Sequence, residues 1–164
     1  AVSGISQAAF TKVFPRKSDD PGILTPGFKY FYFEGDWDKL PDFSGLNAKK
    51  VGSTSNYNLS PRNENEHFGF EFIGYVKVPK DDVYVFYTDS DDGSNLYIGN
   101  KLVVDNDGLH GIAQKKGLIP LSSGFHPIRI SYFNKTGGLE LKVFIEGGGM
   151  KKQALPEELL FHLK

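Results

Sequence analysis

The stretch FGFEFIGYVKV, residues 68–78, carries the clearest structural pattern in the chain. Its large apolar residues recur at alternate positions, while Glu71 and Lys77 fall on the opposite face. An alternation with a period of two is typical of a β-strand that buries one face. The turn-forming residues 79–82 follow, and a second apolar run begins at Val83. The stretch therefore predicts a strand with an antiparallel neighbour directly after it.

The same period continues along the chain. We expect further strands near residues 83–87, 96–98, 101–104, 127–133 and 139–145, with Gly99-Asn100 suited to a tight primed hairpin turn. Only residues 156–160 look helical, and they are few. This pattern predicts an all-β protein, an antiparallel β-sandwich or barrel with one short C-terminal helical turn. The residues expected to be mostly buried are Phe70, Phe72, Val76, Val85, Leu96, Ile98, Ile130, Tyr132, Leu141 and Val143.

Composition sets broad limits on partners and chemistry. The 164 residues are enough for one domain with a real core. A net charge of −1 gives no electrostatic reason to expect nucleic acid or an anionic membrane, and suits a neutral ligand. The sequence has no apolar run long enough for membrane insertion. It has no cysteine, which excludes disulfides and thiolate chemistry.

The first 26 residues differ from the rest of the chain. They hold three prolines and show little periodicity. We interpret residues 1–26 as a lead-in segment or linker, which indicates that the domain was cut from a longer protein, and residues 27–164 as the β-sandwich module. The alternative is an ordinary N-terminal strand that crosses the surface of the barrel.

Two polar loops carry most of the candidate chemistry. Residues 88–94 follow one predicted strand, and residues 105–111 follow the second strand of the hairpin. If the hairpin pairs through Gly99-Asn100, both loops lie at one end of the sheet. Carboxylates that meet in a small volume repel one another unless a cation or hydrogen-bond donors neutralise them, and Ca²⁺ prefers such hard oxygen ligands. Alternatively, Asp91-Asp92-Gly93 only forms a turn.

A series of segments resembles a known domain family. Residues 68–79, 83–86, 90–98, 101–106, 124–133 and 155–160 are similar, in order, to the protective-antigen fourteen-kilodalton domain family, named for a segment of the anthrax toxin. The resemblance covers about residues 27–162. It implies a β-sandwich barrel used as an accessory module of larger exported proteins, such as bacterial glycosidases and adhesins. In the adhesin members, two adjacent aspartates joined by a cis peptide hold Ca²⁺, which in turn holds sugar hydroxyls; Asp91 and Asp92 match that pair.

The resemblance does not supply every ligand. The adhesins carry a separate loop with a further ligand, often an Asn, and that loop cannot be aligned with this sequence. The convergence of the two polar loops makes three other residues the nearest candidates, and His110 is a candidate ligand contact in the same loop. The predicted ligand-binding residues are therefore Asp91, Asp92, Asp105, Asn106, Asp107 and His110, with Asp91 and Asp92 as the metal ligands.

These patterns favour binding over catalysis. The sequence has no nucleophile-elbow, phosphate-loop or dinucleotide motif, and carboxylates crowded on an open rim would hardly keep the proton that a glycosidase acid needs. Trp37 and Tyr57 lie among polar residues and either stack on a sugar ring or belong to the core.

We therefore expect a non-catalytic carbohydrate-binding module of a larger secreted, periplasmic or cell-surface protein that processes glycans or mediates adhesion. Its partners would be a glycan or terminal sugar and the neighbouring domains of the parent protein. The alternative is a structural or protein-interaction module that packs beside a catalytic domain without binding sugar.

Overall fold

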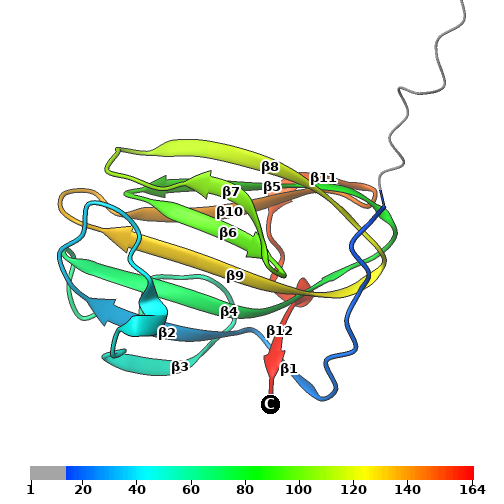
Figure 1. Ribbon diagram of the computed structural model, residues 1–164, viewed down its shortest axis with the longest axis horizontal. Coiled ribbons are helices and arrows are strands. Elements are labelled where there is room, and N and C mark those ends of the chain that lie inside the picture. The colour runs from blue at the N-terminus through cyan, green and yellow to red at the C-terminus, as the bar shows by residue number, and fades with distance from the viewer. Residues whose placement is uncertain (1–13) are drawn as a thin grey trace, which may run out of the picture.

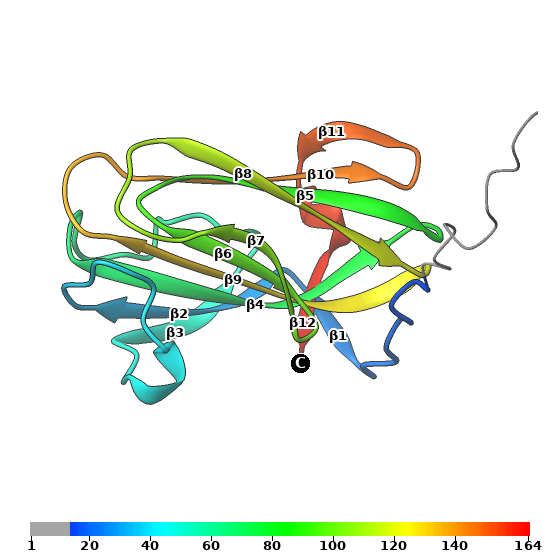
Figure 2. The same ribbon diagram turned by 45° about the horizontal axis from the view of Figure 1, so that its top comes forward.

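Two antiparallel sheets face each other across a shared core (Figures 1 and 2). The computed structural model describes residues 14–164. Within these residues the larger, eight-stranded sheet comprises β1 (Leu24–Pro26), β2 (Phe28–Glu34), β3 (Lys50–Thr54), β4 (Phe68–Val78), β6 (Ser94–Ile98), β7 (Lys101–Asn106), β9 (Gly124–Asn134) and β12 (Leu160–Leu163). The four-stranded sheet comprises β5 (Asp82–Asp91), β8 (Ala113–Leu121), β10 (Glu140–Gly147) and β11 (Met150–Ala154).

The connectivity places sequence-distant strands side by side. The larger sheet runs β1-β12-β4-β9-β6-β7, with β2 pairing with both β3 and β4, and the smaller sheet runs β11-β10-β5-β8. Two single-turn 3-10 helices, η2 (Phe43–Gly45) and η3 (Glu157–Leu159), complete the described part. The predicted antiparallel β-sandwich is confirmed, and η3 is the predicted C-terminal helical turn.

The alternating residues of β4 form the centre of the core. Phe68, Phe70 and Phe72 are fully buried, and their rings lie 5.3–5.9 Å apart along the strand. Each large apolar side chain that leaves water contributes roughly 1.5–3 kcal/mol, so this row is a major part of the driving force for folding.

The predicted core is correct except at Val85. The other nine residues named above are buried, whereas Val85 on β5 is partly exposed and points away from the core. Residues 83–86 are all apolar, so the alternation of apolar and polar residues does not show which side chains of β5 face the core. Tyr84 and Phe86 occupy the core instead, because the larger rings remove more apolar surface from water.

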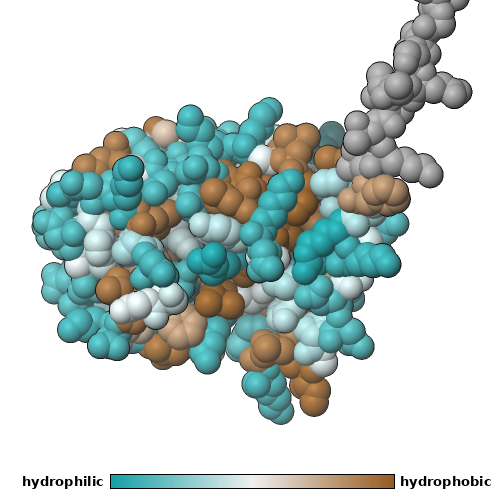
Figure 3. Space-filling view, viewed as in Figure 1, coloured by the Kyte–Doolittle hydropathy of each residue, from teal (hydrophilic) through white to brown (hydrophobic). Residues whose placement is uncertain are grey.

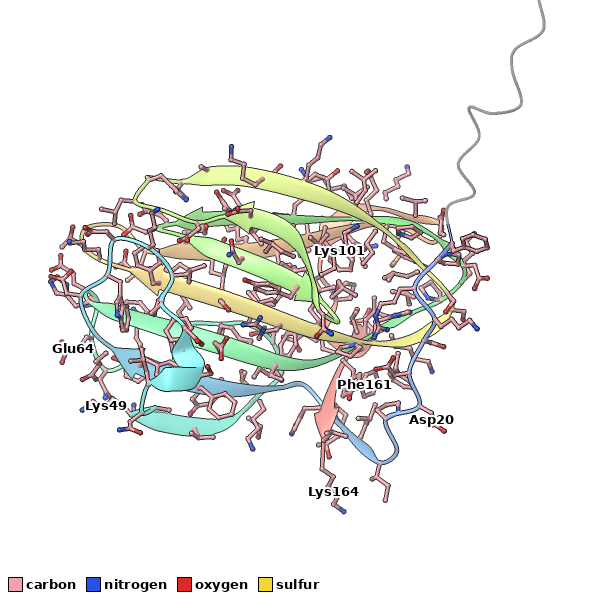
Figure 4. All side chains as sticks on the ribbon, viewed as in Figure 1. Asp20, Lys49, Glu64, Lys101, Phe161 and Lys164 are labelled. Atoms are coloured by element: carbon pink, nitrogen blue, oxygen red, sulfur yellow. The ribbon has the colours of Figure 1, made fainter. Side chains whose placement is uncertain are left out.

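The β6–β7 hairpin brings the two polar loops to one end of the sandwich. Ile98 pairs with Lys101, so Gly99-Asn100 is the two-residue turn, and Gly99 has the positive φ of +56° that primed turns require. In the same register Ser94 lies opposite Asn106. In Figure 4, Glu64 lies at the end that carries these loops and Asp20 lies toward the other end.

Residues 14–26 lie against the other end of the domain. Arg16 and Asp19 make isolated bridges with Leu121 and Phe125, and β1 pairs with β12. The remainder of the predicted lead-in segment, residues 1–13, lies outside the described residues, and the division at residue 26 stays a prediction. No helix among residues 14–164 has the length and apolarity needed to cross a membrane.

A buried histidine anchors this N-terminal segment. The guanidinium of Arg16 donates to Nδ1 of His126 at 2.8 Å, and Nε2 of His126 donates to the Ser122 carbonyl at 2.7 Å. His126 is fully buried. Burial lowers the pKa of His126. The hydrogen bond to the Ser122 carbonyl raises this pKa, while the Arg16 charge lowers it further, and the net shift is downward. The neutral ring is therefore the form that the fold stabilises.

We predict that acidification weakens the fold through His126. Because its folded pKa lies below the unfolded value of about 6.5, the unfolded chain binds more protons, and stability falls as the pH drops through that value. Urea unfolding between about pH 7.5 and about pH 5 should show a smaller loss of stability in His126→Gln than in the wild type. Equal losses in the two proteins would contradict this assignment.

Candidate functional site

The carboxylate of Asp92 joins two loops at the polar end of the sandwich. Its Oδ1 accepts the backbone N–H of His110 at 3.1 Å, and its Oδ2 accepts the N–H of Lys135 at 2.9 Å. Asp92 is only 6% exposed. Hydrogen bonds to an ionised carboxylate are about twice as strong as neutral ones, so Asp92 fixes the loops that follow β7 and β9 against the end of β5.

Asp91 differs from its neighbour in having an uncommitted carboxylate. The Asp91–Asp92 peptide is cis, as the family resemblance implies. The Asp91 side chain accepts no hydrogen bond from any residue in the described part of the chain, while its carbonyl oxygen accepts the Tyr132 hydroxyl at 2.6 Å. Burial raises the pKa of Asp91, and the Asp92 charge raises it further. A cation at this point would favour the ionised form of both carboxylates.

A third oxygen donor lies at the end of β9. Gly93 accepts the Phe133 N–H, so the antiparallel register places Asn134 opposite Asp92. Asn134 is fully buried, and its Nδ2 donates to the Asn65 carbonyl at 2.8 Å. Its Oδ1 is buried and has no hydrogen-bond partner among residues 14–164. An unpaired buried acceptor costs about 1–3 kcal/mol, and a bound cation would remove that cost.

The donor types of these three side chains suit a hard cation. Two carboxylates and one amide oxygen are the donor types that Ca²⁺ takes in proteins. Asn134 is not among the site residues predicted from the sequence. A polar residue directly after the alternating strand 127–133 was the available signal, but its position opposite Asp92 depends on the pairing of β9 with β6.

His110 lies next to the pair, in contacts that favour its protonated ring. Its Nδ1 lies 2.8 Å from the Gly111 carbonyl and its Nε2 lies 2.9 Å from the Asn106 carbonyl. Carbonyl oxygens only accept, so the doubly protonated ring satisfies both contacts. Burial lowers the pKa of His110, but the two carbonyls and the charges of Asp92 and Asp91 outweigh it, and the pKa lies above its ordinary value. Both ring nitrogens are thus held within their own loop.

Asn106 is a buried residue that stabilises the polar end of the sandwich. Its Nδ2 donates to the Ala113 carbonyl at 2.9 Å and lies 3.2 Å from the Ser90 hydroxyl, and the residue is buried. The side chain therefore ties β7 to β5 and to the start of β8.

The other two predicted acids lie elsewhere. Asp105 is exposed and accepts the N–H of Asp107, and Asp107 Oδ1 accepts the N–H of Leu40 at 2.8 Å. Between residues 14 and 164, no cluster of three or more His, Asp or Glu side chains is arranged to hold a metal ion. The two polar loops do meet, but the acids of the second loop do not join Asp91 and Asp92 in such a cluster.

The two candidate stacking aromatics are both engaged within the protein. The Trp37 ring packs edge-on against Phe43, with 5.8 Å between the ring centroids. The Tyr57 ring packs against the core, and its hydroxyl donates to the Val143 carbonyl at 3.0 Å. Both aromatic side chains are partly exposed, and neither presents a fully open ring face to a sugar.

Lys135 connects the Trp37 loop to the rim. Its backbone N–H is bonded to Asp92, and its ammonium lies 3.2 Å from Asp36 and 2.5 Å from Asp38. Because these acids are exposed, the ion pairs add little stability, but they place the two loops side by side.

The fold and these loops define a β-sandwich module with a cis-linked aspartate pair at one end. Residues 24–151 match the PA14 domain. The chain belongs to the PA14 domain family. None of the curated proteins matches the chain.

Solved structures with the same fold include binding domains and parts of longer proteins. An anti-sigma factor domain-containing protein from Clostridium clariflavum is 23% identical over 85% of this chain, with a TM-score of 0.71. The PA14 sugar-binding domain of an RTX adhesin is 13% identical, covers 84% of this chain and 98% of its own, and has a TM-score of 0.66. The epithelial adhesin 9 A domain from Candida glabrata, solved with Galβ1-3GlcNAc, is 13% identical over 92% of this chain and 96% of its own, with a TM-score of 0.67. This chain spans about half the length of the anti-sigma factor domain-containing chains that it matches.

Two isosteric changes on neighbouring residues of β7 test the structural role of Asn106. Asn106→Asp places a carboxylate against the Ala113 carbonyl in a buried site, and we expect a loss of at least ~1–3 kcal/mol in the free energy of unfolding. Asp105→Asn changes an exposed side chain that keeps its acceptor oxygen, and should leave stability nearly unchanged. Urea unfolding of both variants checks this, and similar losses in the two would contradict the assigned roles.

Proposed function

We propose that this PA14 domain is a non-catalytic module that binds a terminal sugar residue through Ca²⁺ held at Asp91 and Asp92. The observation that carries the proposal is the set of oxygen donors at the rim. Within residues 14–164, the Asp91 carboxylate accepts no hydrogen bond, and the buried Oδ1 of Asn134, the residue before the Lys135 N–H that Asp92 accepts, has no partner.

Each side chain of this set has a separate task. The backbone N–H groups of His110 and Lys135 hold Asp92, which leaves further lone pairs on its oxygens for a cation. Asp91 and Asn134 supply the remaining side-chain ligands. When bound, Ca²⁺ supplies positive charge and coordination positions that sugar hydroxyl oxygens can fill.

The arrangement supports binding rather than hydrolysis. A glycosidase needs two carboxyl groups that face each other across a sugar, one of which acts on the leaving group. Here the two carboxylates belong to consecutive residues, and both oxygens of Asp92 are engaged by backbone N–H groups. We therefore assign catalysis, where the parent protein has any, to another domain.

A rim site of this kind should bind a single sugar weakly. Each hydrogen bond that replaces a bond to water contributes only about 0.5–1.5 kcal/mol, and association itself costs several. A dissociation constant in the millimolar to high-micromolar range follows. Weak binding suits an accessory domain of a larger exported protein, because a tethered neighbour then meets the glycan at high effective concentration. The solved adhesin complexes with galactose-containing glycans support this class of ligand.

Calorimetric titration of chelator-treated protein with Ca²⁺ tests the metal. The wild type should bind, and Asp91→Asn should bind at least about tenfold more weakly, which is a difference of roughly 1.4 kcal/mol. Because the Asp91 carboxylate receives no hydrogen bond from the described residues, this variant should keep the unfolding midpoint of the metal-free wild type. Asp105→Asn serves as the matched control and should bind Ca²⁺ normally. Wild-type affinity in Asp91→Asn would contradict the site.

A glycan array probed with and without chelator tests the ligand. We expect weak signals for glycans with a particular terminal sugar, and we expect them to disappear on chelation and in Asp91→Asn. A domain that ignores every sugar at millimolar concentration, yet binds a neighbouring domain of its parent protein tightly, would instead have the structural role.

A further inference from the structure

A second polar cavity lies on the outer face of the larger sheet, the face turned to the viewer in Figures 1 and 3. It has a volume of about 370 Å³. Two cross-strand pairs of β6 and β9, Asn95 with Ser131 and Tyr97 with Arg129, lie at its base. The segment 40–43, which leads into η2, and Asp107 complete the lining. We call this cavity the outer pocket.

A nearly buried amide contributes unused hydrogen-bond donors to the outer pocket. Asn95 is 8% exposed, and its Oδ1 accepts the N–H of Asn106 at 3.2 Å. Its Nδ2 donates to no residue that the structure describes. These amide N–H groups reach the surface of the pocket, where they are open to water or to an acceptor on a ligand.

Two other lining residues, Asp107 and Asp42, supply carboxylate acceptors. Asp107 uses Oδ1 for the N–H groups of Leu40 and Gly108, and Asp42 uses Oδ1 for the N–H and hydroxyl of Ser44. The second oxygen of each carboxylate accepts no hydrogen bond from residues 14–164. The Ser44 contacts lower the pKa of Asp42, so its carboxylate is ionised at neutral pH.

The arginine at the base is already partly neutralised. Arg129 donates to Glu71 at 2.9 Å, and its guanidinium lies 4.0 Å from the centroid of the Tyr97 ring. Only one of its N–H groups is used in this ion pair, so others remain as donors. With Glu71 balancing Arg129, the two lining carboxylates leave the outer pocket negative.

These features select a particular ligand chemistry. A sugar hydroxyl both donates and accepts, and adjacent hydroxyls match a pocket that is lined by carboxylate acceptors together with amide and guanidinium donors. The negative charge opposes phosphates and carboxylate sugars. Leu40 and Pro41 add a small apolar surface for the C–H groups of a ring. The volume lies in the range of about 300–1,000 Å³ that is typical of small-molecule sites.

We propose that the outer pocket is a second carbohydrate subsite, which binds one neutral sugar unit without a metal ion. It goes beyond the function proposed for Asp91 and Asp92, because its ligands are separate side chains. Asp107, predicted from the sequence as a ligand contact at the rim, belongs to this subsite instead.

The test is a nuclear magnetic resonance titration in the presence of chelator, which removes any contribution of Ca²⁺. The probes are the methyl glycosides of galactose, glucose and mannose at millimolar concentration, with glucuronate as the charged comparison. We expect at least one neutral glycoside to shift the side-chain NH₂ signals of Asn95. Asn95→Asp should weaken this binding at least about tenfold, because it replaces the donors and keeps the acceptor for Asn106.

Two further variants keep the test decisive. Asp42→Asn changes an exposed side chain that still accepts the Ser44 N–H, so it should fold even where Asn95→Asp does not, and it should also weaken binding. Asp91→Asn should bind the glycoside as the wild type does, which separates this subsite from the calcium site. The proposal is overturned if no neutral glycoside moves the Asn95 signals, if Asp91→Asn loses the response, or if glucuronate binds as well as the neutral probes.

Discussion

The carboxylate of Asp92 is the constraint on which the functional end of this domain depends. It is nearly buried, and each of its oxygens accepts a backbone N–H from a different loop, one after β7 and one after β9. These bonds place the two loops side by side, with Asn134 directly before the Lys135 N–H that Asp92 accepts. Lys135 extends the arrangement, because its ammonium group reaches the acids that flank Trp37. Removing this carboxylate would therefore alter the loops as well as a metal ligand.

Much of the fold follows from local pattern. The alternation in residues 68–78 and the Gly99-Asn100 turn predict a strand and a hairpin that the structure confirms, because burial of one sheet face and a tight turn leave few alternatives. The inward face of β5 was predicted wrongly. Residues 83–86 are all apolar, so either alternate pair of side chains could face the core. Only the packing of Tyr84 and Phe86 against the opposite sheet decides it.

The site was less accessible to sequence reasoning than the fold. The hairpin register shows that two polar loops share one end, and the resemblance singles out Asp91 and Asp92. Neither the register nor the resemblance shows where each side chain points. Asn106 turns inward to the Ala113 carbonyl, while Asp107 turns toward the outer pocket. Asn134 is brought to the rim by the pairing of β9 with β6, two strands that are distant in the sequence and adjacent in the sheet, and no local pattern reports such a pairing.

The two candidate sites differ in the groups that they offer a ligand. The rim offers oxygen ligands for a cation, and the outer pocket offers amide donors together with carboxylate acceptors. A crystal structure of the domain grown with millimolar Ca²⁺ tests the proposed metal site most directly. We expect an ion bonded to Asp91, Asp92 and the Oδ1 of Asn134. A metal-free rim, with the aspartates bonded only to backbone N–H groups, would contradict the proposed metal site.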